Sequence, residues 1–564
     1  MHINKLKTKD GQEIGLGKFT VLIGPNNVGK SQTLKDVHNK FTQGNGFVTT
    51  LVKSIVCEEP EGISDLFYGL DVKPDPKVVG RSQISGITSK LNSSDNLAIN
   101  IEHIERQVKQ NGINSIFGSL AKYRVSYLDS ESRLVVAKTS PSINTHKYTP
   151  QNLMQALYAA ENDVENSLRE AFQTTFEMDI KLDYSGLTEL CFRVSKRFDG
   201  VPSDSKESFK YFENYPILDD QGDGYRSFVG VVLSLLLSEN RIVLLDEPEA
   251  FLHPAQARTL GLWIANHAHS VPGQVVISTH NSNFIAGVLA ANKPVDIFRL
   301  NRKDDVTTFT QISPQSTKAL ARSPVLSSQR VLDALFHRGV AVCEADSDRI
   351  VYSTVSNNEF NNQELLFIHA HNKQTVHVVL ELLISANIPC GAVVDFDILN
   401  DLSDLERIAS ALGTSINENE VEIVAKVKKY IESLDDSESL AKLKDDLREL
   451  LTQLESDEHS FSGARGAVNR IRKDFSKWRD VKSEGSKVFP PELLREVEVL
   501  ISSLNSKCIF IAPVGELEGW IDVGTKRKNK WIVPALEYLG ENPAPSELKE
   551  FVGTILNTLV AGKL

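Results

Sequence analysis

A glycine-rich turn after a short apolar run constrains this fold more than any other feature of the sequence. Residues 18–23 form the apolar run, and the turn reads Gly24-Pro25-Asn26-Asn27-Val28-Gly29-Lys30-Ser31. The pattern G-x-x-x-x-G-K-S binds phosphate when it follows a strand and opens a helix. Its backbone N–H groups curl around the phosphates, the lysine reaches the β and γ phosphates, and the serine binds Mg²⁺. The turn therefore predicts an ATP and Mg²⁺ site on an α/β sheet, with contacts from Gly24, Asn26, Asn27, Gly29, Lys30 and Ser31.

The partner of such a turn is an acidic strand end, and the sequence supplies one. Residues 242–245 are apolar and lead into Asp246 and Glu247. We expect Asp246 to hold Mg²⁺ through water and Glu247 to polarise the attacking water. The alternative is an acidic strand end that only caps the next helix. Glu249 and His253 follow closely, and local structural roles explain them at least as well.

A third strand and a glycine-rich turn complete the predicted ATP site. Residues 274–279 read as a strand, so His280 at its end is placed to sense the γ phosphate. The turn Gly222-Asp223-Gly224-Tyr225-Arg226-Ser227 precedes an apolar segment, residues 228–237, that suits a buried helix. A plain helix cap is the alternative interpretation of this turn.

This turn resembles the signature segment of ABC-type ATPases, although its wording departs from the usual Leu-Ser-Gly-Gly-Gln. In that family the segment contacts the γ phosphate of ATP bound by the opposite subunit. The resemblance implies that Gly224 and Ser227 bind nucleotide. It also implies a homodimer, or a higher homo-oligomer, formed through the ATPase domain with two ATP molecules between the heads.

A second acidic constellation lies downstream of the complete ATP site. Acidic groups follow apolar, strand-like runs at three places: Glu344 to Asp348, Asp395 to Asp397, and Glu516 to Glu518. Parallel strands bring such groups to one edge of a sheet, where they repel each other unless cations bind between them. This arrangement predicts a Mg²⁺ or Mn²⁺ site of the kind that cleaves phosphodiesters. A solvated acidic rim is the alternative.

Strands and helices alternate around these acidic groups. The pattern predicts strands over 339–343, 366–370 and 390–394, with helices over 346–356 and 375–386. Asp395 and Asp397 straddle Phe396, so an extended segment would turn both carboxylates to the same side.

This part of the chain resembles the Toprim domain of topoisomerases, primases and the OLD-family (overcoming lysogenization defect) ATP-dependent nucleases. The family pattern is a Glu after the first strand and an Asp-x-Asp after the third, matched by Glu344, Asp395 and Asp397. The usual Gly after that Glu is Ala345 here. OLD nucleases add an acid four residues after the Glu, matched by Asp348, and a late Gly-x-Leu-Glu, matched by residues 515–518. The nuclease subunit of Gabija antiphage systems shares the layout.

The resemblance implies a metal-dependent DNA endonuclease fused to an ATPase, acting in antiphage defence, with a partner protein or nucleic acid as a further expectation. Its metal ligands would be Glu344, Asp348, Glu516 and Glu518 for one or both ions and Asp395 and Asp397 for the second. The family also implies a late catalytic lysine. Lys530 is our choice, with Lys528 and Lys563 as alternatives.

Length and composition set the domain plan. The chain has 564 residues, is 41% hydrophobic and 24% charged, and is too long for one core. We expect an α/β protein: an ABC-type P-loop ATPase domain with an inserted helical dimerisation region, then a Toprim (Rossmann-like) domain with a helical insertion. The expected bounds are 1–320 for the ATPase domain (insertion about 55–215, helical part about 149–177), 321–335 for a linker, and 336–564 for the Toprim domain (insertion about 399–499).

Charge and cysteine usage narrow the class further. The net charge of −12 argues against a general nucleic-acid coat protein but not against a nuclease, because metal ligands account for part of the acid. A basic stretch at 465–487 either follows a phosphate backbone or forms a solvated helix. The five scattered cysteines suit reduced core thiols, and no signal-peptide core or membrane span is evident, so we expect a cytoplasmic protein.

A function of another class also fits the sequence. An ATP-switched DNA-binding or sensor protein with an inactive Toprim domain would hydrolyse ATP without cutting DNA. A topoisomerase is disfavoured because Tyr352 falls inside a predicted helix rather than in a strand-passage domain. A primase is disfavoured because no zinc-ribbon cysteines are present.

Overall fold

The computed structural model divides the chain into two compact units, residues 1–336 and 337–564. It describes residues 1–44, 46–58, 64–238, 240–270, 273–322, 329–370, 372–434, 443–445, 447–452, 465, 468, 478–525 and 528–560. Each unit is built on its own parallel sheet, and each is described separately below.

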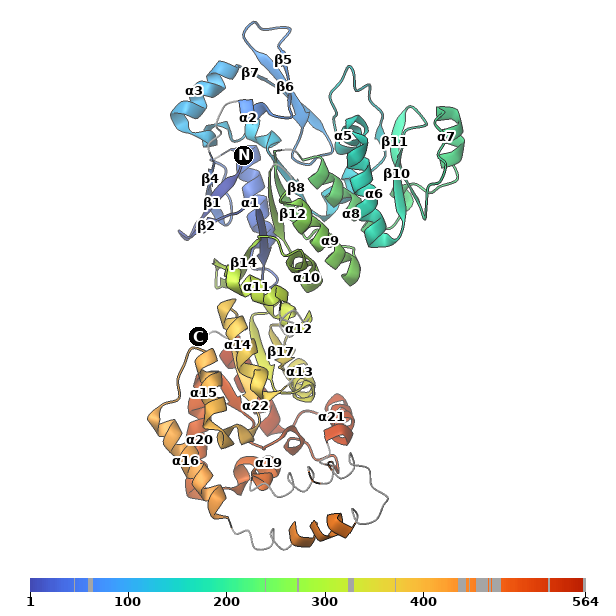
Figure 1. Cartoon of the computed structure of the whole chain (residues 1–564). Coiled ribbons are helices and arrows are strands. Elements are labelled where there is room, and N and C mark those ends of the chain that lie inside the picture. Colours follow the sequence, from blue (N-terminus) through green and yellow to red (C-terminus); the bar gives the residue numbers. More distant parts are fainter. Residues whose placement is uncertain are drawn as a thin grey trace. The chain divides into compact units, whose positions relative to one another are not determined.

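Unit 1 is organised around a six-stranded sheet in the order β15-β14-β3-β13-β12-β8 (Figure 1). Neighbours from β14 to β8 run parallel, and only β15 is antiparallel. The central strands β3 and β13 are buried along their whole length and mostly apolar, because helices cover both faces of such a sheet. The strands are β3 (Phe19–Ile23), β8 (Val125–Leu128), β12 (Ile242–Asp246), β13 (Gln274–Ser278), β14 (Asp296–Lys303) and β15 (Val306–Gln311).

Helices connect these strands and bury their apolar sides. The helix predicted over 228–237 is present as α8 (Asp223–Leu236), with nine buried residues. It begins five residues earlier than predicted, so Gly222 is its N-cap and the rest of the glycine-rich segment at 222–227 is helical rather than a separate turn. Helix α8 packs against α4 (Ser130–Val136), and α9 packs against α10. The remaining helices of unit 1 are α1 (Lys30–Gln43), α2 (Ser64–Phe67), α3 (Ile101–Asn111), α5 (Leu153–Ala159), α6 (Asn162–Phe176), α7 (Ser205–Phe212), α9 (Pro254–His267), α10 (Ser282–Ala290), α11 (Pro314–Arg322) and α12 (Gln329–Asp333).

The segment expected as one insertion, residues 55–215, is not set apart from the sheet. Its strand β8 pairs in parallel with β12 and forms an edge of the main sheet. The helical part expected over 149–177 is two helices, because the chain turns extended at Ala160 and Glu161 between α5 and α6. Three small antiparallel sheets complete the unit: β2-β1-β4 (Glu13–Gly15, Ile3–Thr8, Val52–Cys57), β5-β6-β7 (Asp71–Pro74, Ser82–Ile87, Ser94–Ile99) and β10-β11-β9 (Asp179–Asp183, Glu189–Ser195, Ser140–Pro141).

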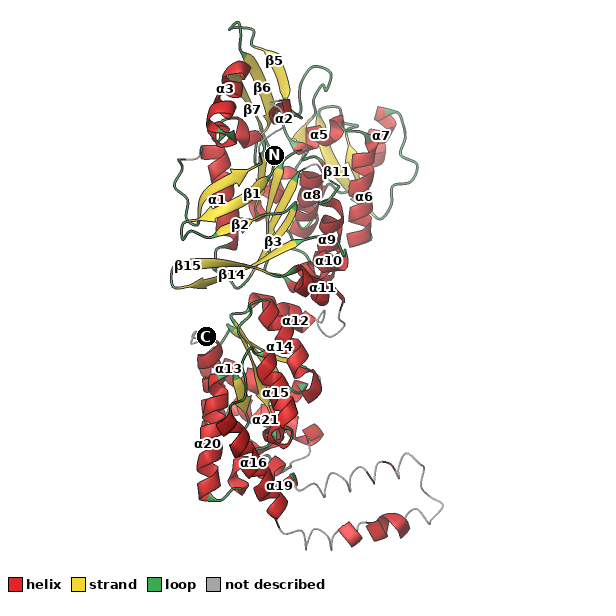
Figure 2. Ribbon diagram, turned by 60° about the vertical axis from the view of Figure 1, so that its left-hand side comes forward, coloured by secondary structure: helices red, strands yellow, loops and turns green. Residues whose placement is uncertain are grey.

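Unit 2 has a four-stranded parallel sheet in the order β17-β16-β18-β19, flanked by helices (Figure 2). The first three strands lie where the sequence predicts them: β16 (Gly339–Cys343), β17 (Leu365–His369) and β18 (Cys390–Val394). The fourth, β19 (Ile509–Ile511), comes from the far side of the helical segment. All four carboxyl ends therefore open onto one edge, as in other open α/β sheets.

The helices of unit 2 follow the predicted alternation. Asp346 opens α13 (Asp346–Phe360), and α14 (Val376–Ser385) follows β17. Described helices of the segment at 399–499 are α15 (Leu402–Ala411), α16 (Glu418–Ser433), α19 (Arg479–Glu484) and α20 (Pro491–Ser506), and the chain ends with α21 (Lys528–Glu541) and α22 (Ser546–Leu559). Part of the basic stretch at 465–487, including Arg470, Arg472, Lys473 and Lys477, lies outside the described residues, and Arg465, Lys482 and Lys487 lie inside them.

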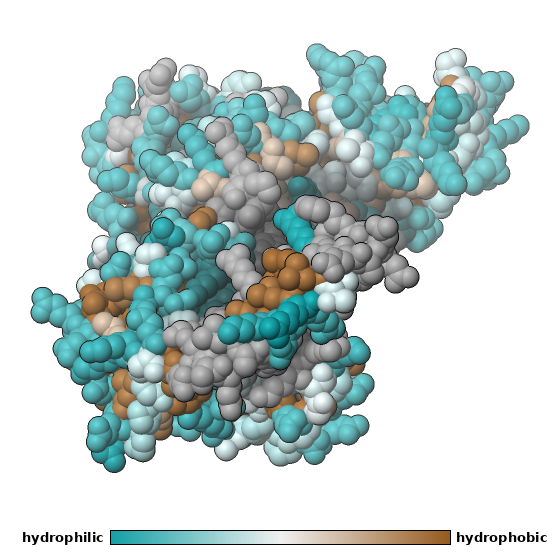
Figure 3. All heavy atoms as spheres, turned by 60° about the horizontal axis from the view of Figure 1, so that its bottom comes forward, coloured by the Kyte–Doolittle hydropathy of each residue, from teal (hydrophilic) through white to brown (hydrophobic). Residues whose placement is uncertain are grey.

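The surface of the described chain is mainly hydrophilic on the face shown in Figure 3, with small apolar patches between charged side chains. Among the described helices, none is both long enough and apolar enough to cross a lipid bilayer.

The contact between α4 and α8 leaves no room for a side chain at Gly230. A Cβ atom there would lie 2.4 Å from the carbonyl oxygen of Arg133. We expect Gly230→Ala to lower the free energy of unfolding by about 1–3 kcal/mol, since the two helices must move apart. Chemical unfolding of the full chain measures this.

Gly540 in α21 is the matched control, because it also lies in a helix but has open space around it. Gly540→Ala should raise stability by up to about 1 kcal/mol through helix propensity alone. Equal effects of the two substitutions would contradict the close α4–α8 contact.

Candidate active sites

The phosphate loop links β3 to α1 through residues with unusual backbone angles. Gly24 and Gly29 have φ values of 136° and 104°, and Asn27 also lies in the left-handed region at 62°. A Cβ atom on Gly24 would lie 2.3 Å from the carbonyl oxygen of Leu300. Only glycine suits that position, which explains the first glycine of the pattern. Asn26 and Asn27 are exposed, and Ser31 is half-buried at the start of α1.

Lys30 is enclosed by the loop that it belongs to. Its side chain is 6% exposed, and Nζ donates 2.8 Å hydrogen bonds to the carbonyl oxygens of Gly24 and Pro25. Burial lowers the pKa of Lys30 to about 8, opposed by the charges of Glu247, Asp246 and Glu249. The ammonium group is thus held beside acids from the next strands, as the motif predicts for a lysine that meets phosphate.

The acids and the histidine predicted from three distant segments meet at the carboxyl ends of β12 and β13. Asp246 accepts hydrogen bonds from the hydroxyl groups of Ser278 and Tyr127. Glu247 has a left-handed φ of 50°, and its Oε1 lies 2.8 Å from Nδ1 of His280. This hydrogen bond raises the pKa of His280 and lowers the pKa of Glu247. The pair joins a potential base to a potential charge sensor at one edge of the sheet.

Arg133 holds the acidic turn in place. Its buried guanidinium donates to the carbonyl oxygens of Asp246 (2.5 Å) and Glu247 (2.9 Å) and to the hydroxyl of Ser227 (3.1 Å). One side chain thereby fixes the strained backbone at Glu247 and ties it to α8. Arg133 lies in α4, the helix that follows β8, so recognising that strand as part of the main sheet was the missing signal.

The glycine-rich turn at 222–227 is divided between surface and interior. Gly224 lines a shallow pocket with Gly222, Tyr225 and Gln256, and a Cβ atom on it would approach the carbonyl oxygen of Phe251 at 2.8 Å. Ser227 is fully buried and accepts its hydrogen bond from Arg133. Of the two residues predicted to touch nucleotide, Gly224 therefore lies at the surface and Ser227 does not.

Glu249 and His253 have local partners. Glu249 is 3% exposed and accepts a 2.6 Å hydrogen bond from the hydroxyl of Thr279, and burial raises its pKa to about 6. The backbone N–H of His253 donates to the side-chain oxygen of Gln256 in the first turn of α9. Glu249 thus links the acidic turn to the residue before His280, whereas His253 caps a helix.

In unit 2 the carboxylate at the end of β16 bonds to the end of β18. Oε1 of Glu344 accepts a 3.1 Å hydrogen bond from the backbone N–H of Asp395. Burial raises the pKa of Glu344 to about 7, and the charges of Asp397 and Asp348 act in the same direction. Two of the three residues that carry the Toprim resemblance are therefore in direct contact.

Asp397 faces two lysines. Its carboxylate lies 2.8 Å from Nζ of Lys482 and 3.3 Å from Nζ of Lys373. Burial acts to raise the pKa of Asp397, but these two cations outweigh it and hold that pKa below its usual value. The segment after Asp395 forms a 3₁₀ turn (Phe396–Asn400) rather than the extended segment expected, because Asp395 already occupies the helix N-cap. The expectation that both aspartates project alike from extended backbone is wrong.

The remaining predicted acids of unit 2 differ in their surroundings. Asp348 is 5% exposed and accepts from the backbone N–H of Ala345 at 2.9 Å, which closes the first turn of α13. Asp346, which we did not predict to act, pairs with Arg349 (2.7 Å) and lies 3.4 Å from His369. Glu516 is exposed, and its backbone N–H donates to the carbonyl oxygen of Lys482.

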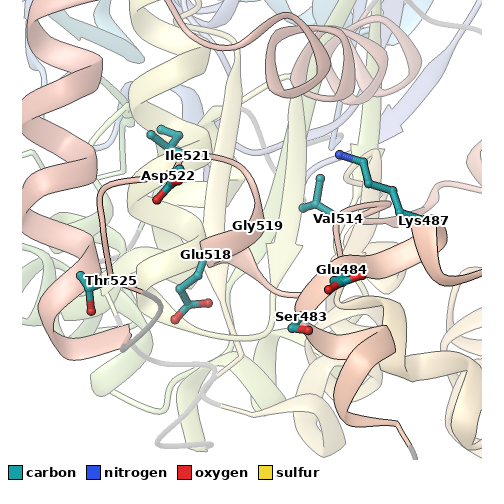
Figure 4. A pocket seen from close by; sticks show the side chains of 9 residues that line it. All are labelled: Ser483, Glu484, Lys487, Val514, Glu518, Gly519, Ile521, Asp522 and Thr525. Carbon is teal, nitrogen blue, oxygen red and sulfur yellow. The ribbon is translucent and has the colours of Figure 1, made fainter.

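Glu518 lines a cavity of about 310 Å³ together with Ser483, Glu484, Asp522 and Thr525. Figure 4 shows its carboxylate pointing into the space between α19 and the loop that carries Thr525. Glu518 is 8% exposed, and its buried Oε2 has no hydrogen-bond partner among the described residues. A buried carboxylate oxygen without a donor is costly and marks this position as one that suits a cation.

The full set of predicted metal ligands is not assembled into one cage. Within the described part of the chain, no group of three or more His, Cys, Asp or Glu side chains has the arrangement of a metal site. Lys530 is exposed on α21, and the side chains of its alternatives Lys528 and Lys563 lie outside the described residues. The sequence analysis did not predict Lys373 as a site residue, although it follows β17 as the acids follow their own strands.

Comparison with known proteins identifies one part of unit 1. Residues 79–286 match the family model described as "AAA domain, putative AbiEii toxin, Type IV TA system". The match covers less than half of the chain and includes Asp246, Glu247 and His280, but it begins after the phosphate loop. No curated protein matches the chain.

Solved structures that resemble the chain are heads of SMC proteins. The SMC head domain from Thermotoga maritima is 14% identical, and the alignment covers 56% of this chain and 100% of that one, with a TM-score of 0.27. The Smc head derived from Pyrococcus furiosus is 11% identical, with 57% and 98% coverage and a TM-score of 0.33.

The family match and the geometry together define the class of unit 1. The phosphate loop, the acidic end of β12 and the histidine after β13 lie at one edge of the sheet. Unit 1 is a P-loop ATPase domain that binds ATP, for which Mg²⁺ is the usual companion ion. Unit 2 is a separate α/β domain that no comparison identifies.

The role of Arg133 leads to a first prediction at this site. Arg133→Met removes all its hydrogen bonds to the acidic turn and leaves the nearby acids without their buried cation. We expect ATP turnover to fall by more than about tenfold and the free energy of unfolding to fall by about 3–5 kcal/mol. Arg338→Met is the control, because the Arg338 side chain is 42% exposed and its ion pair among the described residues is with the exposed Glu364; its effect should stay within about 0.5 kcal/mol.

Glu344 provides a pH-dependent prediction. Its folded-state pKa of about 7 exceeds the ordinary 4.5, so its contribution to stability is complete below pH 4.5 and is lost as pH rises through 7. Glu344→Gln keeps the acceptor oxygen for Asp395 without the charge. In chelator, this variant should match the wild type at pH 4.5 and be more stable by about 2–3 kcal/mol at pH 8.

The exposed Glu364 supplies the control for this experiment. Glu364→Gln should show no such growth of the stability difference with pH. A difference between Glu344→Gln and wild type that stays constant from pH 4.5 to pH 8 would contradict the raised pKa.

Proposed function

We propose that this protein is an ATP-hydrolysing, divalent-metal-dependent DNA endonuclease whose ATPase domain governs its cutting domain. The observation that carries the proposal is the contact between Glu344 and Asp395 at the carboxyl edge of a parallel sheet, in a chain that already has an ATPase domain. The contact brings together two residues of the acidic set, and the lysine-paired Asp397 follows two residues later.

In the ATPase domain the division of labour follows from position. Lys30 leaves the carbonyl oxygens of its own loop to meet the β and γ phosphates, and Ser31 and Asp246 hold Mg²⁺, which screens phosphate charge. Glu247 orients the attacking water and accepts its proton. His280 bonds to Glu247, so it fixes the direction of that carboxylate and can report the state of the γ phosphate.

In the cutting domain the donor set suits a hard divalent cation because every candidate ligand is a carboxylate. Glu344, Asp348 and Glu518, with Glu516, would hold one or both ions, and Asp395 and Asp397 would hold the second. Bound Mg²⁺ or Mn²⁺ would activate the attacking water and stabilise the departing oxygen. The unpartnered Oε2 of Glu518 and the raised pKa of Glu344 support this assignment, since a cation relieves both.

Lysines beside the carboxylates have a role in the same proposal. Lys373 and Lys482 both reach Asp397, and a scissile phosphate group placed there would take over one of these cations. Lys482 belongs to the basic stretch for which the sequence allows either contact with a phosphate backbone or a solvated helix, and its position beside Asp397 favours the first. Either lysine is therefore a better-placed cation for phosphate than Lys530, which remains our sequence-based choice for the catalytic lysine.

Biological context enters through resemblance and the matched family model. The description of the family model that matches residues 79–286 mentions a toxin and a toxin–antitoxin system, which is consistent with a role in antiphage defence. A homodimer through the ATPase domain, with Gly224 at its contact, and a defence partner protein or nucleic acid complete the proposal.

A second candidate function has its own support. The lysine pairing of Asp397 and the lack of a metal-type cluster among the described residues favour an ATP-switched DNA-binding or sensor protein with an inactive second domain. It shares the ATPase chemistry and differs only in having no cutting step.

Plasmid nicking separates the two functions. Supercoiled plasmid is incubated with the full chain and Mg²⁺ or Mn²⁺, with and without ATP. We expect Glu344→Ala and Asp395→Ala to lower the rate of nicking by more than about 100-fold. Loss of a residue that only hydrogen-bonds to a metal ligand lowers activity about 10- to 100-fold, and loss of a ligand itself should cost more. Circular dichroism verifies that both variants fold.

Two further variants complete the design. Glu364→Ala removes an acid at the opposite edge of the same sheet and should keep full nicking. Lys30→Ala should abolish ATP turnover and alter the response of nicking to ATP. If the wild-type chain hydrolyses ATP but does not nick the plasmid, the ATP-switched DNA-binding or sensor function is favoured. If every variant nicks the plasmid as fast as the wild type, the cutting activity does not come from the carboxylates of unit 2.

A further inference from the structure

A second cavity lies in unit 1, away from the ATP site. It has a volume of about 500 Å³ and lies among β6, α5, the start of α6 and the end of α8, which Figure 1 labels. Its inner wall includes Arg124 and Arg241, the residues that immediately precede β8 and β12. The ATP site lies at the carboxyl ends of these parallel strands, so the cavity opens at the opposite edge of the sheet.

Both arginines are buried and bonded only to neutral groups. Arg124 is 2% exposed and donates to the carbonyl oxygens of Leu66 and Tyr68. Arg241 is 8% exposed and donates to the carbonyl oxygens of Ile87 and Thr88 and to a serine hydroxyl. Among the described residues, no carboxylate forms an ion pair with either guanidinium. In the part of the chain that the structure describes, two buried cations therefore lie close together without a counterion.

Such an arrangement is unusual because buried charges are normally paired. Arg133 shows the ordinary case: it is equally buried but has Glu249, Asp246 and Asp129 around it. Burial lowers the pKa of Arg124 to about 10, and burial together with the charge of Arg124 lowers the pKa of Arg241 to about 9. An anion in the cavity would offset the free-energy cost of burying these two like charges.

The two guanidinium groups also have donors to spare. Nη1 of Arg124 and Nε of Arg241 make no hydrogen bond in the described structure, and neither is among its enclosed, unpartnered polar atoms. Since both residues line the cavity, these N–H groups are open to it. Guanidinium donors of this kind suit the oxygens of a phosphate group.

The rest of the wall limits what else the ligand can be. Leu70, Leu236 and Leu237 give it apolar surface, and the ring of Tyr123 lies beside them. The outer part carries acids: Asp71, paired with Lys73 at 2.5 Å, and the exposed Glu161 and Asp163 at the start of α6. These acids oppose a long polyanion such as a nucleic-acid strand and favour a compact ligand with its charge at the inner end.

We infer that this cavity binds a small organic monophosphate, of nucleoside monophosphate size, with its phosphate on Arg124 and Arg241 and its ring against the apolar wall. The ligand would regulate the ATPase, because the backbone N–H of Ile242, the first residue of β12, bonds to the carbonyl oxygen of Arg124. Both arginines thus anchor the strands that end near Asp246. The inference stands independently of the proposed cutting activity.

Calorimetric titration of the full chain tests the inference. The Lys30→Ala background weakens phosphate binding at the ATP site, and the probes are the four common nucleoside monophosphates and inorganic phosphate. We expect at least one monophosphate to bind with Kd below about 1 mM and at least tenfold more tightly than inorganic phosphate. No saturable binding, or equal binding of inorganic phosphate, would overturn the assignment.

Ala156, which lines the cavity from α5, allows a matched pair of variants. Ala156→Glu places a carboxylate beside the arginines, so it should raise the melting temperature and weaken monophosphate binding more than tenfold. Ala156→Gln has the same shape without charge and should weaken binding less and give no rise in melting temperature. Equal behaviour of the Glu and Gln variants, or binding unchanged in both, would show that the arginine charges do not hold the ligand.

Discussion

The constraint on which both units depend is the common direction of their central strands. Parallel strands end at one edge, so the residue after each strand meets its neighbours whatever their separation in sequence. In unit 1 this brings Glu247 to His280 at 2.8 Å. In unit 2 it brings Glu344 to the backbone N–H of Asp395 at 3.1 Å. Crowded carboxylates then need cations, and the two units supply them differently: buried Arg133 fixes the first site, and lysines meet Asp397 in the second.

Much of this arrangement could be predicted from sequence, because apolar runs followed by acids identify strands and their ends. The phosphate loop, the buried α8 and the strands at 339–343 and 390–394 all appear where the patterns predict them. The role of β8 could not be predicted: four residues carry too little pattern to show that they join a distant sheet. The buried position of Ser227 could not be predicted for the same reason, since its partner Arg133 lies in α4, the helix that follows β8.

Side-chain pairing in unit 2 was also beyond the sequence. An Asp-x-Asp motif reads equally well as extended backbone or as a helix N-terminus, and the 3₁₀ turn after Asp395 decides between them. The approach of Lys373 and Lys482 to Asp397 depends on a 3₁₀ turn (Lys373–Thr375) and on helix α19, which are far apart in the chain. In unit 1, Arg124 and Arg241 lie at the opposite edge of the six-stranded sheet and have no acidic partner among the described residues. This pair could not be predicted either, because a sequence shows which residues are charged but not which are buried.

The central claim is that carboxylates of unit 2 hold a divalent cation, and manganese binding tests it most directly. Electron paramagnetic resonance of Mn²⁺ titrated into the nucleotide-free full chain should show saturable binding. Asp395→Asn should lose that binding, and Glu364→Gln, altered at the opposite edge of the sheet, should keep it. Absence of saturable binding in the unaltered chain, or identical binding in both variants, would contradict the account.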